Sequence, residues 1–443
     1  MSEIKRVEPR TLSGFMELLP REQIKFNEMK RIIEETYELY GFLPQETPII
    51  EASEVLLAKA GGETEKQIYS FTKGDTDLSL RFDLTVPLAK YVAKNYGQLT
   101  FPYRRYQIGK VFRGERPQKG RYRELYQCDI DIIGNGKLSI ANDAQMPSII
   151  YSIFKKFNFG KFIIRMNNRK ILNGLFEEIG LKDQAKEALV IIDKLDKIGM
   201  DNVKEELRSI GVTEENVTKL EEFFNINKSG SNDEILASLK GLGFKSETFA
   251  EGLKEIEELI TYVRLFGVEE EYFRIDLTIA RGLDYYTGTV YETNIIGYEN
   301  IGSICSGGRY DNLAEYYTKQ NLPGVGISIG LTRLFYVLNE LDLIKIEDSS
   351  ISKAVIVTMG VDFGEGVKIS NALRDKGIKN EIYAEDSKTK NKFSYVDSLN
   401  IPYCIVIGQD EIDKNMYTLK NMTTGEQELL SVDDIIAKLK YSD

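Results

Sequence analysis

The 443-residue chain contains no histidine. This absence excludes Ser-His-Asp and Cys-His nucleophilic sites, because each of them uses an imidazole as its base. It also excludes zinc sites whose ligands include histidine. Any catalysis must therefore depend on carboxylates, Arg, Lys, Tyr, backbone groups or a bound metal ion.

Cysteine and long apolar runs are also scarce. Cys128, Cys305 and Cys404 are the only cysteines, and their wide spacing fits neither a disulfide framework nor a metal cluster. No apolar stretch is long enough to cross a bilayer, and the first twenty residues lack the apolar core of a signal peptide. These features predict a cytoplasmic protein with no membrane association.

The amino-acid balance is typical of a globular protein. Hydrophobic residues make up 42% of the chain and charged residues 29%, and the length predicts two or three domains. The net charge of −11 argues against a protein that coats nucleic acid. A local basic surface remains compatible with it, since affinity for phosphates depends on the patch and not on the total charge.

The order of predicted elements indicates two folded parts. Residues 22–40 have helical periodicity, residues 76–134 predict strands, and residues 172 to about 265 are Lys/Glu-rich with helical periodicity. Because strand signals return at Phe273, the helical stretch is expected to be an insertion between two parts of one sheet. After a polar linker at 345–353, alternating strand and helix patterns predict a small α/β domain.

Three segments alternate apolar and polar residues, which predicts strands with one polar face. Their polar faces carry short carboxylates, Gln and Arg, and not the Lys and Glu of ordinary surfaces. A sheet with one face in water would explain any single segment, but three together favour a face that lines a ligand site. The segments are "LSLRFDLT" (78–85), "LYQCDIDII" (125–133) and "FRIDLTI" (273–279).

Residues 104–123 concentrate positive charge in an acidic protein. Two extended runs flank "GERPQKG", which predicts a strand, a flexible turn and a returning strand. A solvated hairpin is one explanation, but a basic loop that leads into a carboxylate-bearing strand better suits a polyphosphate or a nucleic-acid end. Further along, "GVGISIGLTRLFYVL" (324–338) predicts a strand entering a helix. Arg333 would lie in its first turn and either reach a ligand or extend into solvent.

These segments together resemble the class II histidyl-tRNA synthetases over essentially the whole chain. "GFLPQETPIIEASEVL" resembles motif 1, "FRGERPQKGRYRELYQCDIDIIG" motif 2 and "GVGISIGLTRL" motif 3. "RGLDYYTGTVYE" (281–292) and "SGGRYDNL" (306–313) are similar to the two histidine-specific signatures. The tail from about 352 resembles the family's anticodon-binding domain.

The resemblance implies an α+β fold. Residues 1–345 would form the class II catalytic domain with its antiparallel sheet and the helical insertion at approximately 172–265, 346–353 the linker, and 354–443 an α/β anticodon-binding domain. L-Histidine and ATP, with Mg²⁺, would give histidyl-adenylate, and the histidyl group would pass to the 3′ end of tRNA(His). The resemblance also implies a homodimer built partly through motif 1. Lysines at 388–392 could help steer tRNA, or could form a solvated loop.

The family pattern assigns five residues to ATP and to the chemistry. The attacking carboxylate of histidine is already ionised, so the reaction needs fixed cations around the α-phosphoryl group and no general base. Arg113 would bind the α-phosphate, and Arg281 would lie near the carboxylate and the α-phosphate, as the two catalytic residues. Glu115 would bind the adenine amino group, and Arg121 and Arg333 the distal phosphates.

A second set is expected to bind histidine. A neutral imidazole offers one N–H and one lone pair, so one carboxylate can accept from the ring and one tyrosine hydroxyl can donate to it. Asp131 and Tyr286 suit these two roles. Asp83 and Thr85 suit the α-ammonium, with Gln127 beside them, and Tyr310 suits the pocket wall.

Two non-catalytic proteins are the alternatives. The regulatory subunit of ATP phosphoribosyltransferase binds histidine as a sensor, but generally lacks the anticodon-binding domain and the motif 2 and 3 arginines. A tRNA-binding regulator should also have lost active-site residues. Thr332 and Gln145 stand where Glu is common in the family, yet neither removes a group that the chemistry needs. The enzyme is favoured, because this chain keeps the tail and Arg113, Arg121, Arg281 and Arg333.

Overall fold

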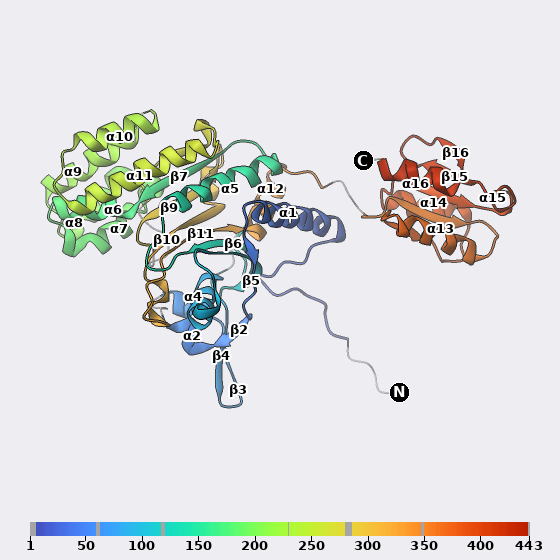
Figure 1. The fold of residues 1–443 in the computed structure, drawn as a ribbon, viewed down its shortest axis with the longest axis horizontal. Coiled ribbons are helices and arrows are strands. Elements are labelled where there is room, and N and C mark those ends of the chain that lie inside the picture. Colours follow the sequence, from blue (N-terminus) through green and yellow to red (C-terminus); the bar gives the residue numbers. More distant parts are fainter. Residues whose placement is uncertain are drawn as a thin grey trace. The chain divides into compact units, whose positions relative to one another are not determined.

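The structure, a computed structural model, describes residues 6–58, 63–116, 120–228, 230–279, 286–346 and 350–441. The chain divides into two compact units (Figure 1). The first comprises Met1–Met16 and Lys30–Ile344, and the second comprises Glu17–Met29 and Lys345–Asp443.

Among the described residues, an eight-stranded sheet forms the centre of the first unit. The strands between its two edges pair antiparallel, while the short edge strands β1 and β8 pair in parallel with their neighbours. This sheet confirms the predicted α+β class. In sheet order the strands are β1 (Leu43–Pro44), β5 (Tyr103–Phe112), β6 (Glu124–Ile133), β11 (Gly324–Gly330), β10 (Cys305–Tyr310), β9 (Thr289–Ile295), β7 (Phe162–Asn168) and β8 (Phe273–Ile275).

Strand β6 follows the predicted alternation. Cys128, Ile130 and Ile132 are fully buried, so the apolar face of the strand belongs to the core. Helix α5 packs against β10 and β11, and helix α12 against β6 and β11. An ion pair of 2.5 Å between Arg309 of β10 and Asp143 of α5 joins helix and sheet. The helices are α1 (Pro20–Leu39), α5 (Ala141–Phe157) and α12 (Leu331–Glu340).

The first polar-faced segment is only partly a strand, so the prediction of strands throughout 76–134 is wrong. Strand β4 (Thr76–Leu80) ends early, and helix α4 (Thr85–Asn95) follows. The Asp83 carboxylate accepts a hydrogen bond from the Val86 backbone N–H at 3.0 Å, and Pro87 lies in the first helical turn. Both features start a helix. Strand β4 pairs with β2 (Ile50–Ala52) and β3 (Ser70–Lys73). Helices α2 (Ser53–Leu57) and α3 (Glu63–Gln67) lie between β2 and β3 in the sequence.

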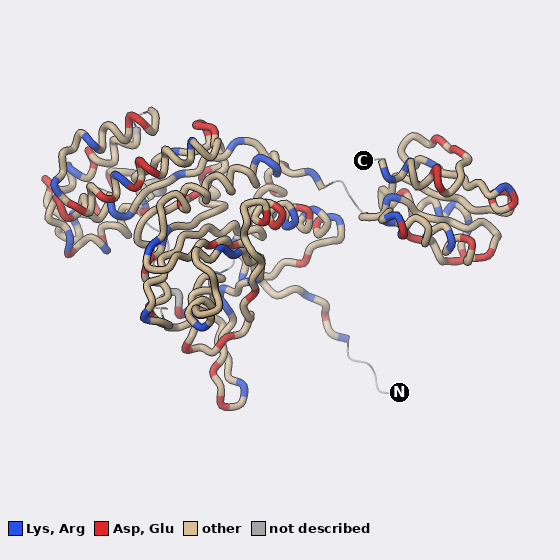
Figure 2. Tube along the Cα trace, in the orientation of Figure 1, with Lys and Arg blue, Asp and Glu red and all other residues tan. Residues whose placement is uncertain are grey.

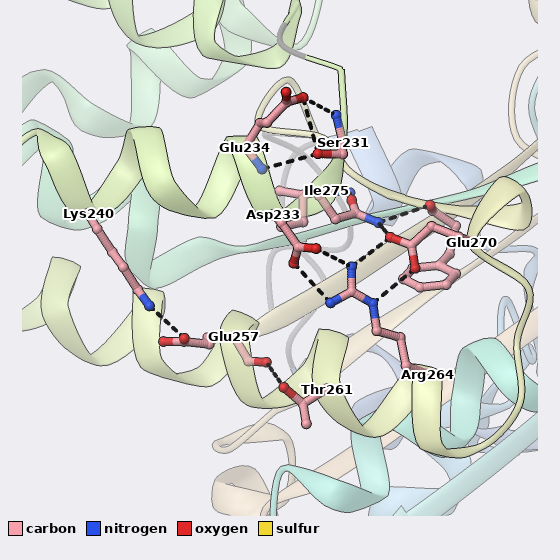
Figure 3. Close-up of polar contacts among 11 residues, drawn as sticks. Ser231, Asp233, Glu234, Lys240, Glu257, Thr261, Arg264, Glu270 and Ile275 are labelled. Carbon is pink, nitrogen blue, oxygen red and sulfur yellow. Dashed lines mark hydrogen bonds and ion pairs between the residues drawn. The ribbon is translucent and has the colours of Figure 1, made fainter.

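Helices occupy the chain between β7 and β8, which are neighbours in the sheet. Helix α10 begins with a capping box of Ser231 and Glu234. Arg264 of α11 donates to Asp233 and Glu270, at 2.9 Å in each case (Figure 3), and so ties α10 to the segment before β8. The helices are α6 (Arg169–Glu178), α7 (Ala185–Ile192), α8 (Leu195–Ser209), α9 (Glu214–Asn225), α10 (Asn232–Gly241) and α11 (Glu247–Leu265).

The third polar-faced segment is a shorter strand than predicted. Strand β8 ends at Ile275, because the Asp276 carboxylate accepts from the Thr278 backbone N–H at 3.0 Å and closes a turn. Asp276 also accepts from Arg165 of β7 at 2.5 Å and from the Asn227 amide at 2.5 Å. This polar face therefore binds other parts of the protein.

The second unit contains a five-stranded sheet within the described residues, in the order β13-β12-β14-β15-β16. Every residue of β12 is buried, because helices cover both faces of the parallel part. Lys392 is 9% exposed and donates to the Thr358 carbonyl at 2.8 Å; it therefore does not belong to an exposed lysine cluster. The elements are β12 (Ala354–Thr358), α13 (Phe363–Asp375), β13 (Asn380–Ile382), α14 (Thr389–Ser398), β14 (Tyr403–Ile407), α15 (Gln409–Lys414), β15 (Tyr417–Asn421), β16 (Gln427–Leu430) and α16 (Val432–Tyr441).

The cysteines are free thiols in the interior. Cys128 and Cys404 are fully buried and Cys305 is 2% exposed. Burial raises the pKa of the Cys404 thiol to about 12 and raises those of the other two thiols as well. Among the helices of the described residues, none has the length and apolar character needed to span a membrane.

Candidate active site

A cavity of about 400 Å³ opens on the polar face of the large sheet. Strand β6 contributes Gln127, Asp129 and Asp131 to its floor, and β11 contributes Ser328 and Gly326. Residues from the β5–β6 loop, α12 and the chain after β4 form the walls. The sheet therefore supplies a rigid base on which side chains from distant parts of the sequence meet.

One end of the floor is held by a buried ion pair. Arg105 lies opposite Asp131 in the β5–β6 register, and the two side chains are 2.7 Å apart with 0% and 4% of their surface exposed. The Tyr310 hydroxyl donates to the other Asp131 oxygen at 2.7 Å. Both oxygens of Asp131 thus have fixed partners, so its position is set before any ligand arrives.

Glycines make room for these groups. Gly326 lies opposite Asp131 in the β6–β11 pairing, and a Cβ there would meet the Asp131 carboxylate at 2.2 Å and the Ile130 carbonyl at 2.5 Å. Gly324 lies opposite Tyr310, whose ring would be 2.4 Å from a Cβ at that position. Strand β11 must therefore lack side chains at both positions.

A polar chain links the floor to an arginine in the wall. The Arg113 guanidinium lies over the Phe82 ring, 4.7 Å from its centroid, and donates to Gln127 Oε1 at 3.4 Å. The Gln127 amide donates to the Ser328 hydroxyl at 2.7 Å, and Ser328 is hydrogen-bonded to Asp129. These contacts connect the carboxylates of the floor with the guanidinium that was predicted to bind the α-phosphate.

Arg121 and Arg333 bring positive charge to the cavity wall. Arg121 is 3.7 Å from the Glu115 carboxylate, and Arg333 donates to the Ile301 carbonyl. Burial and the positive charge of Arg121 lower the pKa of Arg333, while Glu115 opposes this effect. An anion bound between the two arginines would relieve their repulsion.

Burial also shifts the acids of the floor. It raises the pKa of Asp129 to about 7; Arg105 opposes the shift and Asp131 adds to it. The pKa values of Asp131 and Asp83 are raised by burial too. Removing carboxylates from water favours their protonated forms unless a cation lies close by.

The structure brings together ten of the eleven residues that the sequence predicted for this site. Arg281 lies outside the described residues. Thr332 and Gln145 have other contacts: the Thr332 hydroxyl accepts from the Tyr126 backbone N–H at 2.8 Å, and Gln145 accepts from Arg104 at 2.7 Å. The ten that line the cavity are Asp83, Thr85, Arg113, Glu115, Arg121, Gln127, Asp131, Tyr286, Tyr310 and Arg333.

Other cavity residues had no predicted role. Asp129 belongs to the alternation that revealed Gln127 and Asp131, so the signal for it was present. Ser328 and Glu292 line the cavity as well, but nothing in their local sequence distinguishes them from ordinary strand residues. Arg105 was counted with the basic hairpin, and its burial became evident only from the strand pairing.

The antiparallel sheet, with its strand–loop–strand and strand–helix segments around one cavity, is the catalytic architecture of a class II aminoacyl-tRNA synthetase. The histidyl-tRNA synthetase family matches residues 14–334, and an anticodon binding domain matches residues 353–441. The chain belongs to the histidyl-tRNA synthetase family, whose members are histidine–tRNA ligases.

Relatives match along almost the whole chain. It is 55% identical to the histidine–tRNA ligase of Clostridium tetani (strain Massachusetts / E88), over 98% of each chain. The ligase of Finegoldia magna (strain ATCC 29328 / DSM 20472 / WAL 2508) is 50% identical over 98% of this chain and 100% of its own.

Solved structures share the fold. Histidyl-tRNA synthetase from Nostoc sp. PCC 7120 superposes with a TM-score of 0.91 at 42% identity, covering 98% of this chain and 99% of that one. A Bacillus halodurans C protein, described as an ATP phosphoribosyltransferase regulatory subunit/histidyl-tRNA synthetase, has a TM-score of 0.75 at 19% identity. It covers 91% of this chain and 99% of its own, and shows a common fold only.

Gly326→Ala is expected to disable the histidine end of the cavity. The added Cβ would displace the Asp131 carboxylate, and losing a hydrogen bond to a charged group costs roughly 10- to 100-fold in affinity. Calorimetric titration with L-histidine measures the loss in affinity. Gly97→Ala is the matched control, because a Cβ there meets nothing within 4 Å; equal affinities in the two variants would contradict the assignment.

Asp129 is expected to make stability depend on pH near neutrality. Its folded-state pKa of about 7 lies above the ordinary 3.8, so its stabilising proton is held at low pH and lost as the pH rises through 7. Relative to Asp129→Asn, the wild-type chain should therefore lose about 1–3 kcal/mol of unfolding free energy between pH 5.5 and 8. Urea unfolding of both proteins at each pH measures this; a constant difference would argue against the shift.

Proposed function

We propose that this member of the family activates L-histidine with ATP to histidyl-adenylate and transfers the histidyl group to the 3′ end of tRNA(His). One observation carries the proposal: the residues predicted for histidine and those predicted for ATP line a single cavity. The strong full-length similarity to histidine–tRNA ligases supports the choice of amino acid.

The cavity suits a displacement at phosphorus. Arg113 contacts Gln127 at the histidine end and lines the same cavity as the Arg121 and Arg333 side chains. Its guanidinium would stabilise the charge that develops on the α-phosphoryl group as the histidine carboxylate attacks and pyrophosphate leaves. Arg121 and Arg333 would hold the distal phosphates, and Glu115 the adenine amino group. The role of Arg281 rests on the sequence alone.

Magnesium would enter as part of the ATP complex, where it neutralises the phosphate charge. Glu292 lines the same cavity as the phosphate-binding arginines. A carboxylate oxygen fits the ligand preference of the ion. Glu292 would therefore help to hold Mg²⁺ beside the phosphates.

Two parts of the chain would meet tRNA. Besides Arg121, the β5–β6 loop carries Arg116 and Arg123, and these two suit the acceptor end with its phosphates. Residues 353–441, which match the anticodon binding domain, would bind the other end. Basic and acidic residues are interspersed on the helices between β7 and β8 (Figure 2).

We propose a division of the chain into a catalytic domain at 1–345, a linker at 346–353 and an anticodon-binding domain at 354–443.

A cytoplasmic homodimer fits these assignments. The motif 1 region exposes apolar side chains: Leu43 is 62% exposed, Ile49 42% and Ile50 47%. A second copy that covered these side chains would remove apolar surface from water. We expect sedimentation equilibrium to give twice the chain mass and Leu43→Glu combined with Ile50→Glu to lower it; a wild-type monomer would contradict the homodimer.

Histidine sensing by a non-catalytic protein is the second candidate function, and only the shared fold supports it. The regulatory-subunit structure is 19% identical, and a sensor needs no phosphate-binding arginines. Arg113, Arg121 and Arg333 all line the cavity, which favours the enzyme.

L-Histidine is expected to support ATP–pyrophosphate exchange, because the floor offers polar partners to both ends of the molecule. Other common amino acids should give little exchange, since a site built to satisfy the ring nitrogens rejects ligands that leave them unpaired. Purified protein is assayed with each amino acid in turn and then for charging of tRNA(His). Exchange with a different amino acid alone would overturn the proposal, and histidine binding without exchange would indicate a sensor.

Arg281→Ala provides an internal check on this assay. If Arg281 acts on the α-phosphate, the rate of adenylate formation should fall roughly 100-fold or more while histidine binding changes little. An unchanged rate would remove Arg281 from the chemistry without affecting the identity of the amino acid.

A further inference from the structure

Asp129 lies on the cavity floor and has no role in the assignments above. It stands on β6 between Gln127 and Asp131, on the same face of the strand, and lines the cavity with them. Only 3% of its surface is exposed. Ser328 and Ser306 follow it across the neighbouring strands β11 and β10. Both serines line the cavity as well.

The carboxylate of Asp129 is incompletely paired. One contact comes from Ser328, but among the described residues Oδ1 has no hydrogen-bond partner. Arg105 pairs with Asp131, and the register places Gln107, not a cation, opposite Asp129. The Gln107 amide is engaged by Thr47 at 3.2 Å. A buried carboxylate without an adjacent ion-pair partner is costly, so a cationic ligand group would be stabilised here.

The spacing along β6 matches the length of a histidine molecule. Residues two apart on a strand are separated by about 7 Å, which is comparable to the distance between the α-nitrogen of histidine and the far side of its ring. A histidine whose ring contacts Asp131 and Tyr310 can therefore extend along the strand. Its α-ammonium would then lie over Asp129.

The carboxylate first predicted for the ammonium has another task. Asp83 accepts from the backbone N–H groups of Val86 and Thr85 and so caps helix α4. Part of its hydrogen-bonding capacity is therefore used within the protein. A further acceptor on the floor, beside Thr85 and Gln127, would therefore strengthen binding of the ammonium.

We propose that Asp129 binds the α-ammonium group of L-histidine, while Asp131 and Tyr310 contact the ring. This inference rests on the proposed function. Arg105 already neutralises Asp131. An ion pair between Asp129 and the α-ammonium group would neutralise the second carboxylate of the floor. Asp129 would thus recognise the part of the substrate that every amino acid shares, and Asp131 the part that is specific to histidine.

The test compares two ligands that differ only in the ammonium: L-histidine and 3-(imidazol-4-yl)propionate. Asp129→Asn should weaken L-histidine binding roughly 10- to 100-fold, as expected for a lost hydrogen bond to a charged group. Binding of the propionate should change less than about two-fold. Ligand titrations followed by proton NMR measure both, because the chain contributes no imidazole signals of its own.

Asp131→Asn is the matched variant, and it should weaken both ligands. Histamine and 4-ethylimidazole, which differ in the same ammonium, repeat the comparison without a carboxylate. Equal losses for both members of a pair in Asp129→Asn, or no loss for either, would overturn the role of Asp129. Failure of the wild-type protein to bind L-histidine would instead overturn the proposed function. Unchanged propionate binding shows that the variant is folded.

Discussion

The buried ion pair between Arg105 and Asp131 is the interaction on which the cavity floor depends. Neither charge could stay in the interior alone, because the cost of removing it from water would not be offset. The pair in turn requires the β5–β6 register that places the two residues opposite each other, and a neighbouring strand without a side chain at Gly326. The cavity floor is therefore built into the sheet itself, where side chains are held more rigidly than on loops.

The charge of the cavity changes from negative on its floor to positive in its walls. Carboxylates gather where β6 meets β11, while Arg113, Arg121 and Arg333 stand in the walls of the same cavity. A molecule with a cationic end and a partner with several negative charges would be oriented by this gradient before any bond changes. The Arg113–Gln127–Ser328 contacts lie where the two regions meet, so the proposed histidine and phosphate subsites would share one hydrogen-bonded network.

Alternation on β6 is a local property, so the sequence alone placed Gln127 and Asp131 on one face of a strand, whereas most of the other site residues were predicted from the family resemblance. The same reasoning failed for "LSLRFDLT", where the cap at Asp83 starts a helix and overrides the strand pattern. It also predicted too long a strand at β8, because the Asp276 carboxylate closes a turn that ends the strand. Arg105 could not be separated from its basic neighbours, since its burial depends on pairing with a residue twenty-six positions away. The contacts of Thr332 with Tyr126 and of Gln145 with Arg104 arise from tertiary packing, which the local sequence does not reveal.

The burial of every cysteine has a practical consequence. Thiol reagents act on thiolates, and the interior cysteines are both inaccessible and held in the protonated form. A cysteine introduced at an exposed position in each unit would thus be the preferred target for a fluorescent dye, without first removing the native ones. The native cysteines would therefore stay unlabelled in energy-transfer measurements. Such measurements could follow the distance between the two units during a single turnover.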